Sequence, residues 1–491
     1  MTDLKVSPMF SFHIGCRCNT DIFNNEASFG PHMLYYADAT TIVKSSNDKN
    51  EVIILGHITS LSNKGVPSVA EAMAKCDDLD SLLSVEYDCG GKYVIFAYVG
   101  GRSYVITDAT SSVPVYYLAE GADTFVCSSS MKLIADSFNL SKDDKHMHIR
   151  NSGDISQAMP YDITEYKCIK QLLPNHAFHI DTHTAVRFVN ESVYKGIVPL
   201  NDAVKITSPL ISKLTEYYLS LYDIACPITD GKDSRVVLSQ LFAQGKRFPC
   251  YTIDHNSGSA PQVIEIPKKL CDCIDLEYRV LSDATLTDED IAHADDMLGK
   301  GSYSARTLMI AKTIKEAFPQ KAILNGDIVG QVGKCSLHRD IPEFLATPSY
   351  FRCKLHNYSK ESKKLLKAWK KEIYSSGECT NVFDLFSVES RLGRWACQEN
   401  TIYNFIALPY LNIFNSRSII YVWTKVKRTQ RKKAFLNIEL IKGNCEKLLS
   451  VPFEMDSFTS CIAKSNWLMY YISSYIKYFV QKLAFKLKKR G

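Results

Sequence analysis

A six-residue segment near the middle of the chain, Thr229-Asp230-Gly231-Lys232-Asp233-Ser234, contains residue types that could bind a phosphate group. It lies between an apolar run at 223–228 and a helix-like run at 234–245. Gly231 permits a tight turn, after which free amide N–H groups at the start of a helix would face an anion beside Lys232. Asp233 would repel phosphate directly, so its useful role is to bind Mg²⁺, which bridges phosphates. The alternative is a capped helix N-terminus without a ligand, where Asp and Ser are also favoured.

The elements that must position this segment change character along the chain. Residues 1–195 are rich in alternating Val, Ile and Tyr with Gly-Gly and Ser turns, which predicts two packed sheets with a few helices. From about 200, helix-like stretches alternate with short apolar runs, the pattern of a parallel α/β sheet, and beyond about 340 the chain is helical. Ligands bind at the carboxyl ends of parallel strands, which is where the six-residue segment would lie.

Composition restricts the class of protein. A chain of 491 residues exceeds one ordinary core, so we expect two domains, 1–195 and 196–491. The 58 basic and 53 acidic residues are too balanced to indicate a nucleic-acid partner. The 16 cysteines include no C-x-x-C pair, which favours free thiols in a reducing cytoplasm. Neither a signal peptide nor a membrane-spanning apolar run is visible, so we expect a cytoplasmic protein.

The segment 229–234 is similar to the S-G-G-x-D-S pyrophosphate loop of the N-type ATP pyrophosphatases. In order, nearly the whole chain resembles the asparagine synthetase-like family. Its members place a class II glutamine amidotransferase-type sheet sandwich, an Ntn-type α+β fold, before a PP-loop ATP pyrophosphatase domain with a helical C-terminal part. The stretches that carry the likeness are 87–118, 125–136, 162–181, 324–330 and 389–419.

The resemblance implies an ATP-dependent, amide-forming ligase that requires ATP and Mg²⁺. ATP would adenylate a carboxylate with release of pyrophosphate, and ammonia or an amine would then displace AMP. Aspartate, a sugar acid or a peptide carboxylate is the expected acyl substrate, in surface-polysaccharide or secondary-metabolite biosynthesis. Such a site must neutralise phosphate charge and exclude water from the acyl-adenylate.

The resemblance also assigns candidate residues. Those expected to contact phosphate are Thr229, Gly231, Lys232, Asp233, Ser234 and Gly326. Asp233 and Asp327 are the expected Mg²⁺ ligands, and Asp327 is also a candidate catalytic carboxylate. Lys427 and Arg431 reproduce a K-x-x-x-R spacing expected to stabilise departing pyrophosphate, with Lys432 and Lys433 as competitors. Arg306 is either a further phosphate contact or a surface arginine.

Three departures from the family pattern keep an alternative open. The chain begins Met1-Thr2 and its first cysteine is Cys16, so we predict no glutaminase activity. The last two acids of the second family loop are replaced by Gly330 and Gln331, and Asp230 replaces a glycine of the first loop. The alternative is therefore a catalytically inactive nucleotide-binding or assembly protein of the same fold. A tRNA-modifying thiolase ranks last, because Cys226 and Cys250 lack the spacing of a reactive pair.

Two further features of the sequence each allow a structural and a functional interpretation. His176, His179 and His183 lie in a strand-like run, where this spacing does not share one face, so we expect structural histidines. From about 465 the chain predicts a basic amphipathic helix, which either contacts an anionic membrane surface, such as that of the inner membrane, or packs on the core. Its apolar stripe is Leu468, Ile472, Ile476, Phe479, Leu483 and Leu487. Its basic residues are Lys477, Lys482, Lys486, Lys488, Lys489 and Arg490.

Overall fold

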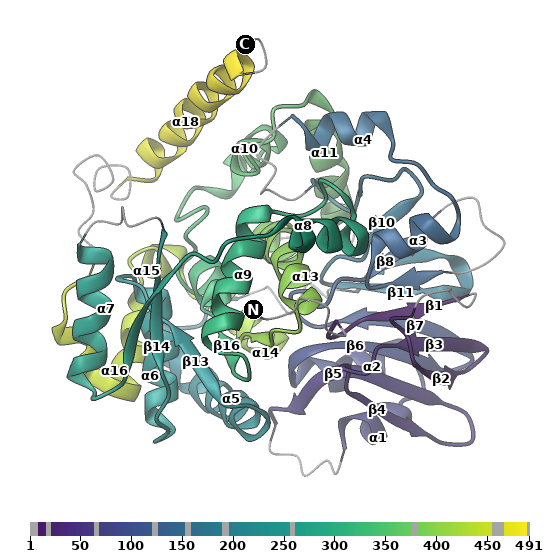
Figure 1. Cartoon of the computed structure of the whole chain (residues 1–491), viewed down its shortest axis with the longest axis horizontal. Helices are drawn as coiled ribbons and strands as arrows, with labels where there is room; N and C mark the ends of the chain where they lie inside the picture. Colours follow the sequence, from purple (N-terminus) through teal and green to yellow (C-terminus); the bar gives the residue numbers. More distant parts are fainter. Residues whose placement is uncertain are drawn as a thin grey trace.

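The N-terminal half is a sandwich of two antiparallel sheets in a computed structural model (Figure 1). The model describes residues 8–15, 21–62, 68–119, 126–152, 159–188, 196–255, 261–375, 381–453 and 466–488. The first sheet has the order β10-β8-β9-β1-β3-β2 and the second β12-β11-β7-β6-β5-β4. The strands of the first sheet are β1 (Phe12–Ile14), β2 (Asn25–Phe29), β3 (His32–Tyr36), β8 (Tyr116–Leu118), β9 (Cys127–Ser128) and β10 (Ile169–Gln171). Those of the second are β4 (Ile42–Ser46), β5 (Glu51–Ser60), β6 (Cys89–Val99), β7 (Arg102–Thr107), β11 (His176–His179) and β12 (Thr184–Arg187).

Side-chain alternation places one apolar core between these two sheets. Phe12 and Leu34 from the first sheet pack with Phe96 and Val105 from the second, all fully buried. The opposite face of the second sheet is covered by α1 (Val69–Ala74) and α2 (Leu79–Tyr87), which form a separate apolar cluster with it. Among the described residues, three short helical elements complete this half: α3 (Met131–Ser137), α4 (Asp144–Arg150) and η1 (Ile180–Thr182).

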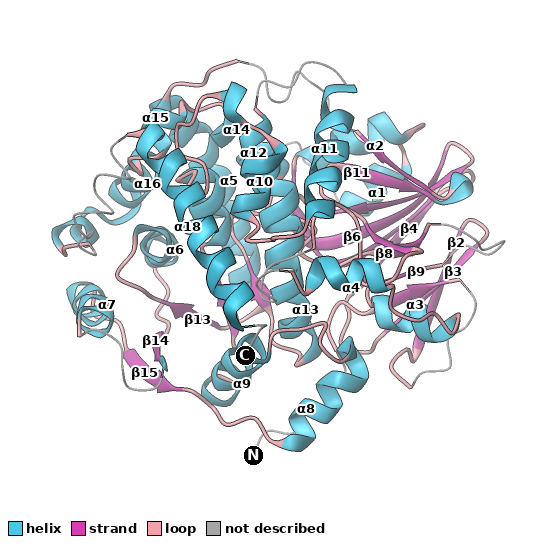
Figure 2. Ribbon diagram, turned by 90° about the horizontal axis from the view of Figure 1, so that it is seen from above, coloured by secondary structure: helices cyan, strands magenta, loops and turns pink. Residues whose placement is uncertain are grey.

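The C-terminal half is built on a five-stranded parallel sheet with the order β15-β14-β13-β16-β17 (Figure 2). Its strands are β13 (Ile224–Pro227), β14 (Cys250–Asp254), β15 (Tyr278–Ser282), β16 (Ala322–Leu324) and β17 (Tyr410–Leu411). The helices between and beside them are α5 (Leu200–Leu221), α6 (Lys232–Ala243), α7 (Gln262–Cys273), α8 (Asp288–Ala294), η4 (Asp295–Gly299) and α9 (Ala305–Ala317). Each expected strand at 223–228, 248–254 and 321–326 is present, so the α/β fold class is confirmed.

Helices make up most of the chain after β16. They are η5 (Val329–Gly333), η6 (Glu343–Leu345), α10 (Pro348–Lys354), α11 (Lys360–Ser375), α12 (Val382–Phe386), η7 (Ser387–Ala396), α13 (Cys397–Phe405), α14 (Arg417–Thr424), α15 (Arg428–Arg431), α16 (Phe435–Cys445), η8 (Glu446–Ser450) and α18 (Trp467–Lys488). The predicted boundary at 195 falls among residues outside the described part of the chain and stays a prediction.

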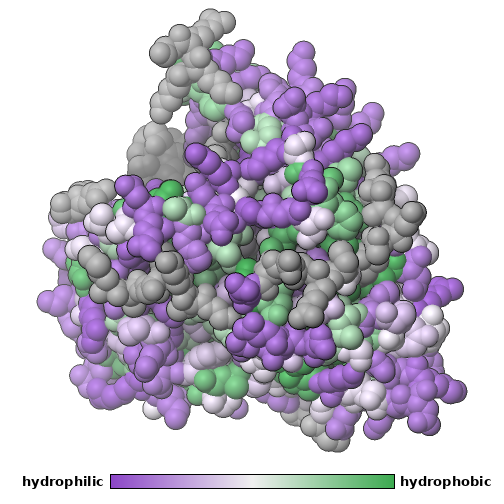
Figure 3. Space-filling view, turned by 45° about the vertical axis from the view of Figure 1, so that its right-hand side comes forward, coloured by the Kyte–Doolittle hydropathy of each residue, from purple (hydrophilic) through white to green (hydrophobic). Residues whose placement is uncertain are grey.

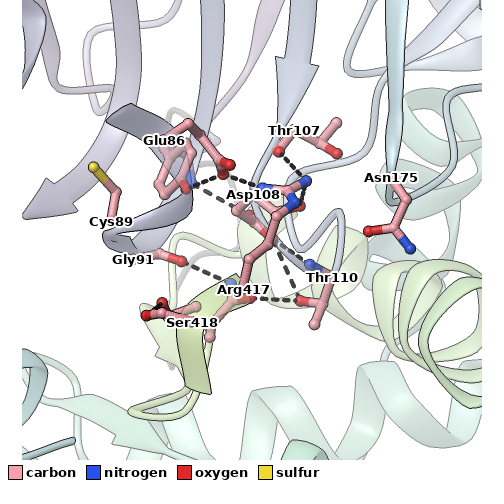
Figure 4. A network of polar contacts seen from close by, with 12 residues as sticks. Glu86, Cys89, Gly91, Thr107, Asp108, Thr110, Asn175, Arg417 and Ser418 are labelled. Atoms are coloured by element: carbon pink, nitrogen blue, oxygen red, sulfur yellow. Dashed lines mark hydrogen bonds and ion pairs between the residues drawn. The ribbon is translucent and has the colours of Figure 1, made fainter. Parts of the chain in front are cut away.

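A buried polar network joins the two halves (Figure 4). Arg417, at the start of α14, reaches into the N-terminal half and forms an ion pair with Glu86, and both side chains are almost fully buried. Its guanidinium also donates to Thr107 O at 3.1 Å. Asn415 Nδ2 donates to Gly91 O at 2.7 Å, and Gly91 N–H donates back to Asn415 O at 3.0 Å. Gly91 has φ +146°, and a Cβ there would lie 2.0 Å from a backbone oxygen of the neighbouring strand β5, so only glycine permits β6 to pair this closely with β5.

Candidate functional site

The loop 229–234 joins the carboxyl end of β13 to the N-terminus of α6, as the sequence predicted. Gly231 is the N-cap of α6. The loop bonds in part to itself: Thr229 N–H donates to Ser234 Oγ at 3.1 Å, and Gly231 N–H donates to Thr229 Oγ1 at 3.2 Å. A phosphate bound here would have to replace these internal contacts.

The loop that follows β16 packs directly against the loop 229–234. A Cβ on Gly326 would lie 3.1 Å from the backbone carbonyl of Asp233, so a glycine lets the two loops approach closely. A Cβ on Gly330 would lie 2.9 Å from Asp233 Oδ2. The family acid that Gly330 replaces therefore could not occupy this position without displacing Asp233. The structure thus brings Asp233, Gly326 and Ser234 together at one edge of the parallel sheet.

Asp233 has two polar partners in the C-terminal half. Lys334 Nζ lies 2.6 Å from Asp233 Oδ2, and the two side chains are 27% and 29% exposed. Asn437 Nδ2 of α16 donates to Asp233 Oδ1 at 2.9 Å. The sequence analysis did not single out Lys334. Its position a few residues after the second loop could have indicated it, because a lysine beside a phosphate-type loop can contact phosphate. Lys334 supplies the positive charge that a metal ion would otherwise provide to Asp233.

Asp327 lies in a second group of charges beside this pair. Burial, together with the negative charge of Asp233, raises the pKa of Asp327 to about 6. Burial and the charge of Asp327 raise the pKa of Glu399 on α13 to about 8. Arg391 acts on both carboxyl groups in the opposite direction. Burial is the main cause of both shifts and repulsion between carboxylates adds to it, so a cation that enters between the two groups would stabilise their charged forms.

The donor set suits one Mg²⁺ ion better than two. Within the described ranges, no group of three or more His, Cys, Asp or Glu side chains could hold a metal ion by itself. Asp233 and Asp327 are two neighbouring carboxylates, and Mg²⁺ is commonly bound by one or two carboxylates together with substrate phosphates and water. Asp233 and Asp327 therefore fit an ion that arrives with a nucleotide, with Lys334 as its competitor.

A strap formed by η8 and residues 451–453 holds the start of α6. Arg235 is fully buried and donates to Leu448 O at 2.9 Å and to Val451 O at 2.7 Å. Two cations lie over the ring of Phe453. Arg235 Cζ is 4.0 Å from the ring centre and Lys232 Nζ is 4.3 Å from it. Burial lowers the pKa of Arg235 to about 10. Lys232, a predicted phosphate contact, thus lies on the aromatic ring of Phe453 in this structure.

Arg431 lies inside the protein, beneath the second loop. It is fully buried, forms a two-armed ion pair with Asp384 at 2.9 and 2.6 Å, and donates to Val332 O at 2.8 Å. Because Val332 belongs to η5, this arginine supports the backbone just before Lys334. Its observed partners are thus structural, and the predicted contact with pyrophosphate stays a prediction.

The other candidate cations lie outside the Asp233 cluster. Lys427 is exposed and lines a hollow together with Arg428, Glu343 and Asp340. Lys432 forms an ion pair of 2.5 Å with Asp340. Lys433 and Arg306 are exposed. The structure therefore brings only some of the predicted site residues together, and the lysine that directly contacts Asp233 is Lys334.

The cysteines and histidines singled out by the sequence have structural surroundings. Cys226 and Cys250 are register partners on adjacent strands, and both are buried. A hydrogen bond with Cys226 and burial raise the pKa of the Cys250 thiol, which makes it less reactive. His176 Nε2 lies 2.8 Å from Glu372 Oε1, and His179 packs edge-on against Tyr104. Met1, Thr2 and Cys16 lie outside the described residues, so the prediction of no glutaminase remains a prediction.

Comparison with known proteins gives distant structural likenesses only. No family model and no curated protein matches the sequence. NMN synthetase from Francisella tularensis matches at 12% identity and a TM-score of 0.20, over 35% of this chain and 71% of that chain. The glutamine phosphoribosylpyrophosphate amidotransferase of B. subtilis, complexed with ADP and GMP, matches at 10% identity and 0.24, over 65% and 75%. A structure described as the allosteric regulatory enzyme of purine biosynthesis matches at 9% identity and 0.24, over 72% and 85%. These TM-scores carry no argument about activity.

Proposed function

We propose that the chain is an ATP-dependent, amide-forming ligase that activates a carboxylate as its acyl-adenylate. The observation that carries this proposal is the contact between the two loops that follow β13 and β16, where Gly326 packs on the backbone of Asp233. This contact gathers a helix N-terminus, two carboxylates and a lysine at the carboxyl edge of a parallel sheet. Such an edge suits a nucleotide, and this combination of groups suits its phosphates.

The proposed reaction has two steps. A carboxylate oxygen attacks the α-phosphorus of ATP, and the bond to the bridging oxygen breaks so that pyrophosphate leaves with the electron pair. An amine or ammonia then attacks the acyl carbon and loses a proton, and AMP leaves. The nitrogen comes from free ammonia or an amine-bearing substrate, and the acyl group from aspartate, a sugar acid or a peptide.

Each residue of the site has a defined task in this proposal. The amides of Gly231 and Ser234 and the side chains of Thr229 and Lys232 would contact the leaving pyrophosphate. Asp233 and Asp327 would hold Mg²⁺, which supplies charge neutralisation on the phosphates when bound. Lys334, on leaving Asp233, would contact a phosphate oxygen. Asp327 and Glu399 would orient the incoming amine.

A second candidate function, an inactive nucleotide-binding or assembly protein of the same fold, is favoured by the internal bonds of the loop 229–234. The Thr229–Ser234 contacts and the Asp233–Lys334 pair satisfy polar groups that an active loop would offer to ATP. Asp230 adds a negative charge close to the proposed position of phosphate.

Pyrophosphate release with Mg·ATP and a panel of carboxylates distinguishes the two functions. We expect release in the unmodified protein and a loss of about 100-fold or more in Asp233→Ala, because the metal and phosphate contacts act on the transition state. Asp223→Ala, which removes an exposed acid just before β13, is the matched control and should keep full activity. ATP binding without pyrophosphate release from any carboxylate would favour the inactive protein. Absence of ATP binding would exclude the ligase.

A further inference from the structure

The C-terminal helix α18 packs on the body through a tyrosine-rich face. Tyr478 is 1% exposed and donates to Asn357 O at 3.2 Å. Tyr471 stacks on Tyr350 of α10, with ring centres 5.2 Å apart. Lys354 Nζ donates to Ser474 Oγ at 2.8 Å. These contacts fix the rotation of the helix about its own axis, and Figure 2 shows α18 lying beside α10.

The opposite face of α18 is apolar and faces solvent. Residues advance about 100° each along a helix, so the predicted stripe falls on the side away from the docked tyrosines. Of the 17 large apolar side chains that are exposed among the described residues, eight lie on this single helix. They are Leu468, Met469, Ile472, Ile476, Phe479, Val480, Leu483 and Leu487, with exposures between 44% and 70%. In Figure 3, small green hydrophobic areas are visible near the top of the molecule, at the height where Figure 1 places α18. Helix α18 therefore packs on the core through one face, as one of the two expectations from the sequence had it, while its apolar stripe stays exposed.

Positive charge borders this apolar face. The helix contains Lys477, Lys482, Lys486 and Lys488 and no acidic residue, and Lys489 and Arg490 follow it in the sequence. On the helical wheel, Lys486 lies at one border of the stripe and Lys477 beyond the other, and both are exposed. Lys482 lies on the docked side, with its ammonium 5.9 Å from the ring centre of Tyr478. Burial, and in addition the neighbouring charges of Arg352, Lys486 and Lys360, lower the pKa of Lys482.

We propose that the exposed face of α18 binds the surface of an anionic membrane, with the helix lying parallel to it. An apolar stripe bordered by lysines is complementary to such a surface, because the stripe enters the acyl boundary while the lysines reach lipid phosphates. Isolated exposed apolar residues are common, but a contiguous set on one face marks a binding surface. No described helix is both long and apolar enough to cross a bilayer, so α18 binds at the interface. This inference is independent of the proposed ligase activity.

Sedimentation of the full chain with lipid vesicles tests the proposal. We expect the protein to pellet with vesicles of equal parts phosphatidylcholine and phosphatidylserine, and much less with phosphatidylcholine alone. The double variant Ile476→Asp/Leu483→Asp should reduce the partition coefficient by about tenfold or more, because two side chains lose their burial in lipid. Lys477→Gln/Lys486→Gln should reduce binding to the anionic vesicles by about fivefold or more, and binding to phosphatidylcholine much less.

The control is a matched double variant on another helix. Ile206 and Leu221 of α5 are 47% and 42% exposed, and α5 lies far from α18 (Figure 1), so Ile206→Asp/Leu221→Asp should bind vesicles like the unmodified chain. Melting followed by circular dichroism checks that both double variants are folded. Undiminished binding by the α18 aspartate variant would overturn the proposal. So would absence of vesicle binding together with a concentration-dependent dimer that this variant abolishes in ultracentrifugation, because the face would then join two copies of the chain.

Discussion

Two ion pairs in this molecule each join a basic side chain to a carboxylate, but one pair is buried and the other is partly exposed to solvent. Arg417 and Glu86 are 3% and 1% exposed, whereas Lys334 and Asp233 are 27% and 29% exposed. Arg417 also donates to backbone oxygens of Thr107 and Asp108, so its partners are fixed by the protein (Figure 4). The Lys334–Asp233 pair has solvent beside it and can exchange one partner for a ligand.

The energetic consequence differs for the two pairs. Removing one member of a buried pair leaves an uncompensated charge inside the protein, which is strongly destabilising. A partly exposed pair contributes about 1 kcal/mol or less, so a phosphate or metal ion can break it at small cost. The comparison indicates that the Arg417–Glu86 pair holds the two halves together. The Lys334–Asp233 pair at the loop 229–234 can instead exchange one partner for a ligand.

The largest expected effect is that of Arg417→Met. Because it leaves the Glu86 carboxylate buried without its cation, we expect the free energy of unfolding to fall by about 3–5 kcal/mol. Urea denaturation followed by circular dichroism measures the change. Glu86→Gln/Arg417→Met, which removes both charges, should recover part of the loss. A loss no larger than that of Lys334→Met would contradict the contrast between the two pairs.

Lys334→Met is expected to act on activity and leave stability nearly unchanged. We expect pyrophosphate release to fall about 10- to 100-fold, because a charge that stabilises the leaving group is lost. The free energy of unfolding should change by less than about 1 kcal/mol. Lys427→Met, at the exposed lysine predicted from the sequence, is the comparison, and we expect it to lose less activity. A larger loss in Lys427→Met would return the pyrophosphate role to that residue.

Gly330→Ala tests the contact between the second loop and Asp233. Its Cβ would lie 2.9 Å from Asp233 Oδ2, so the carboxylate must turn away from Lys334. The affinity for Mg·ATP, measured by calorimetry, should fall several-fold, while stability changes by about 1 kcal/mol or less because only a side-chain end moves. Gly443→Ala on α16 is the matched control, since no atom lies within 4 Å of its Cβ. That control should leave ATP affinity unchanged and raise the free energy of unfolding by about 0.5–1 kcal/mol.

Lys354 contacts α18, and the pH dependence that it gives to the docking of this helix is the smallest expected effect. Burial beneath α18, together with the charges of Arg339, Lys477 and Arg391, lowers the pKa of Lys354 from an ordinary 10.5 to about 7. The charged form is therefore disfavoured when α18 is docked, so docking should strengthen as pH rises from about 7 towards 10.5. Hydrogen exchange of the α18 amides, corrected for the intrinsic effect of pH, should show increasing protection over this range. Lys354→Met should abolish the dependence; a dependence that persists would assign it to another group.

The sequence predicted regular elements better than contacts between them. The strands at 223–228, 248–254 and 321–326 follow from apolar runs between helical stretches, and α6 follows from the loop that precedes it, because these patterns depend on nearby residues. Arg431 shows the limit: its spacing from Lys427 indicated a phosphate contact, whereas the fold buries it against Asp384, 47 residues away. The sequence did not indicate the role of Lys334, because its contact with Asp233 joins two residues that are 101 positions apart in the chain.

By itself, the sequence determined the fold class, the position of the glycine-containing loop and the amphipathic character of the C-terminal helix. Each of these depends on local periodicity, turn residues and the order of elements along the chain. Only the tertiary structure decided which cation neutralises Asp233, which arginine is sealed between the halves and which face of α18 remains exposed. The physical reason is that burial and the pairing of charges depend on distances between segments that are remote in sequence, and these distances are set by the packing of the whole chain.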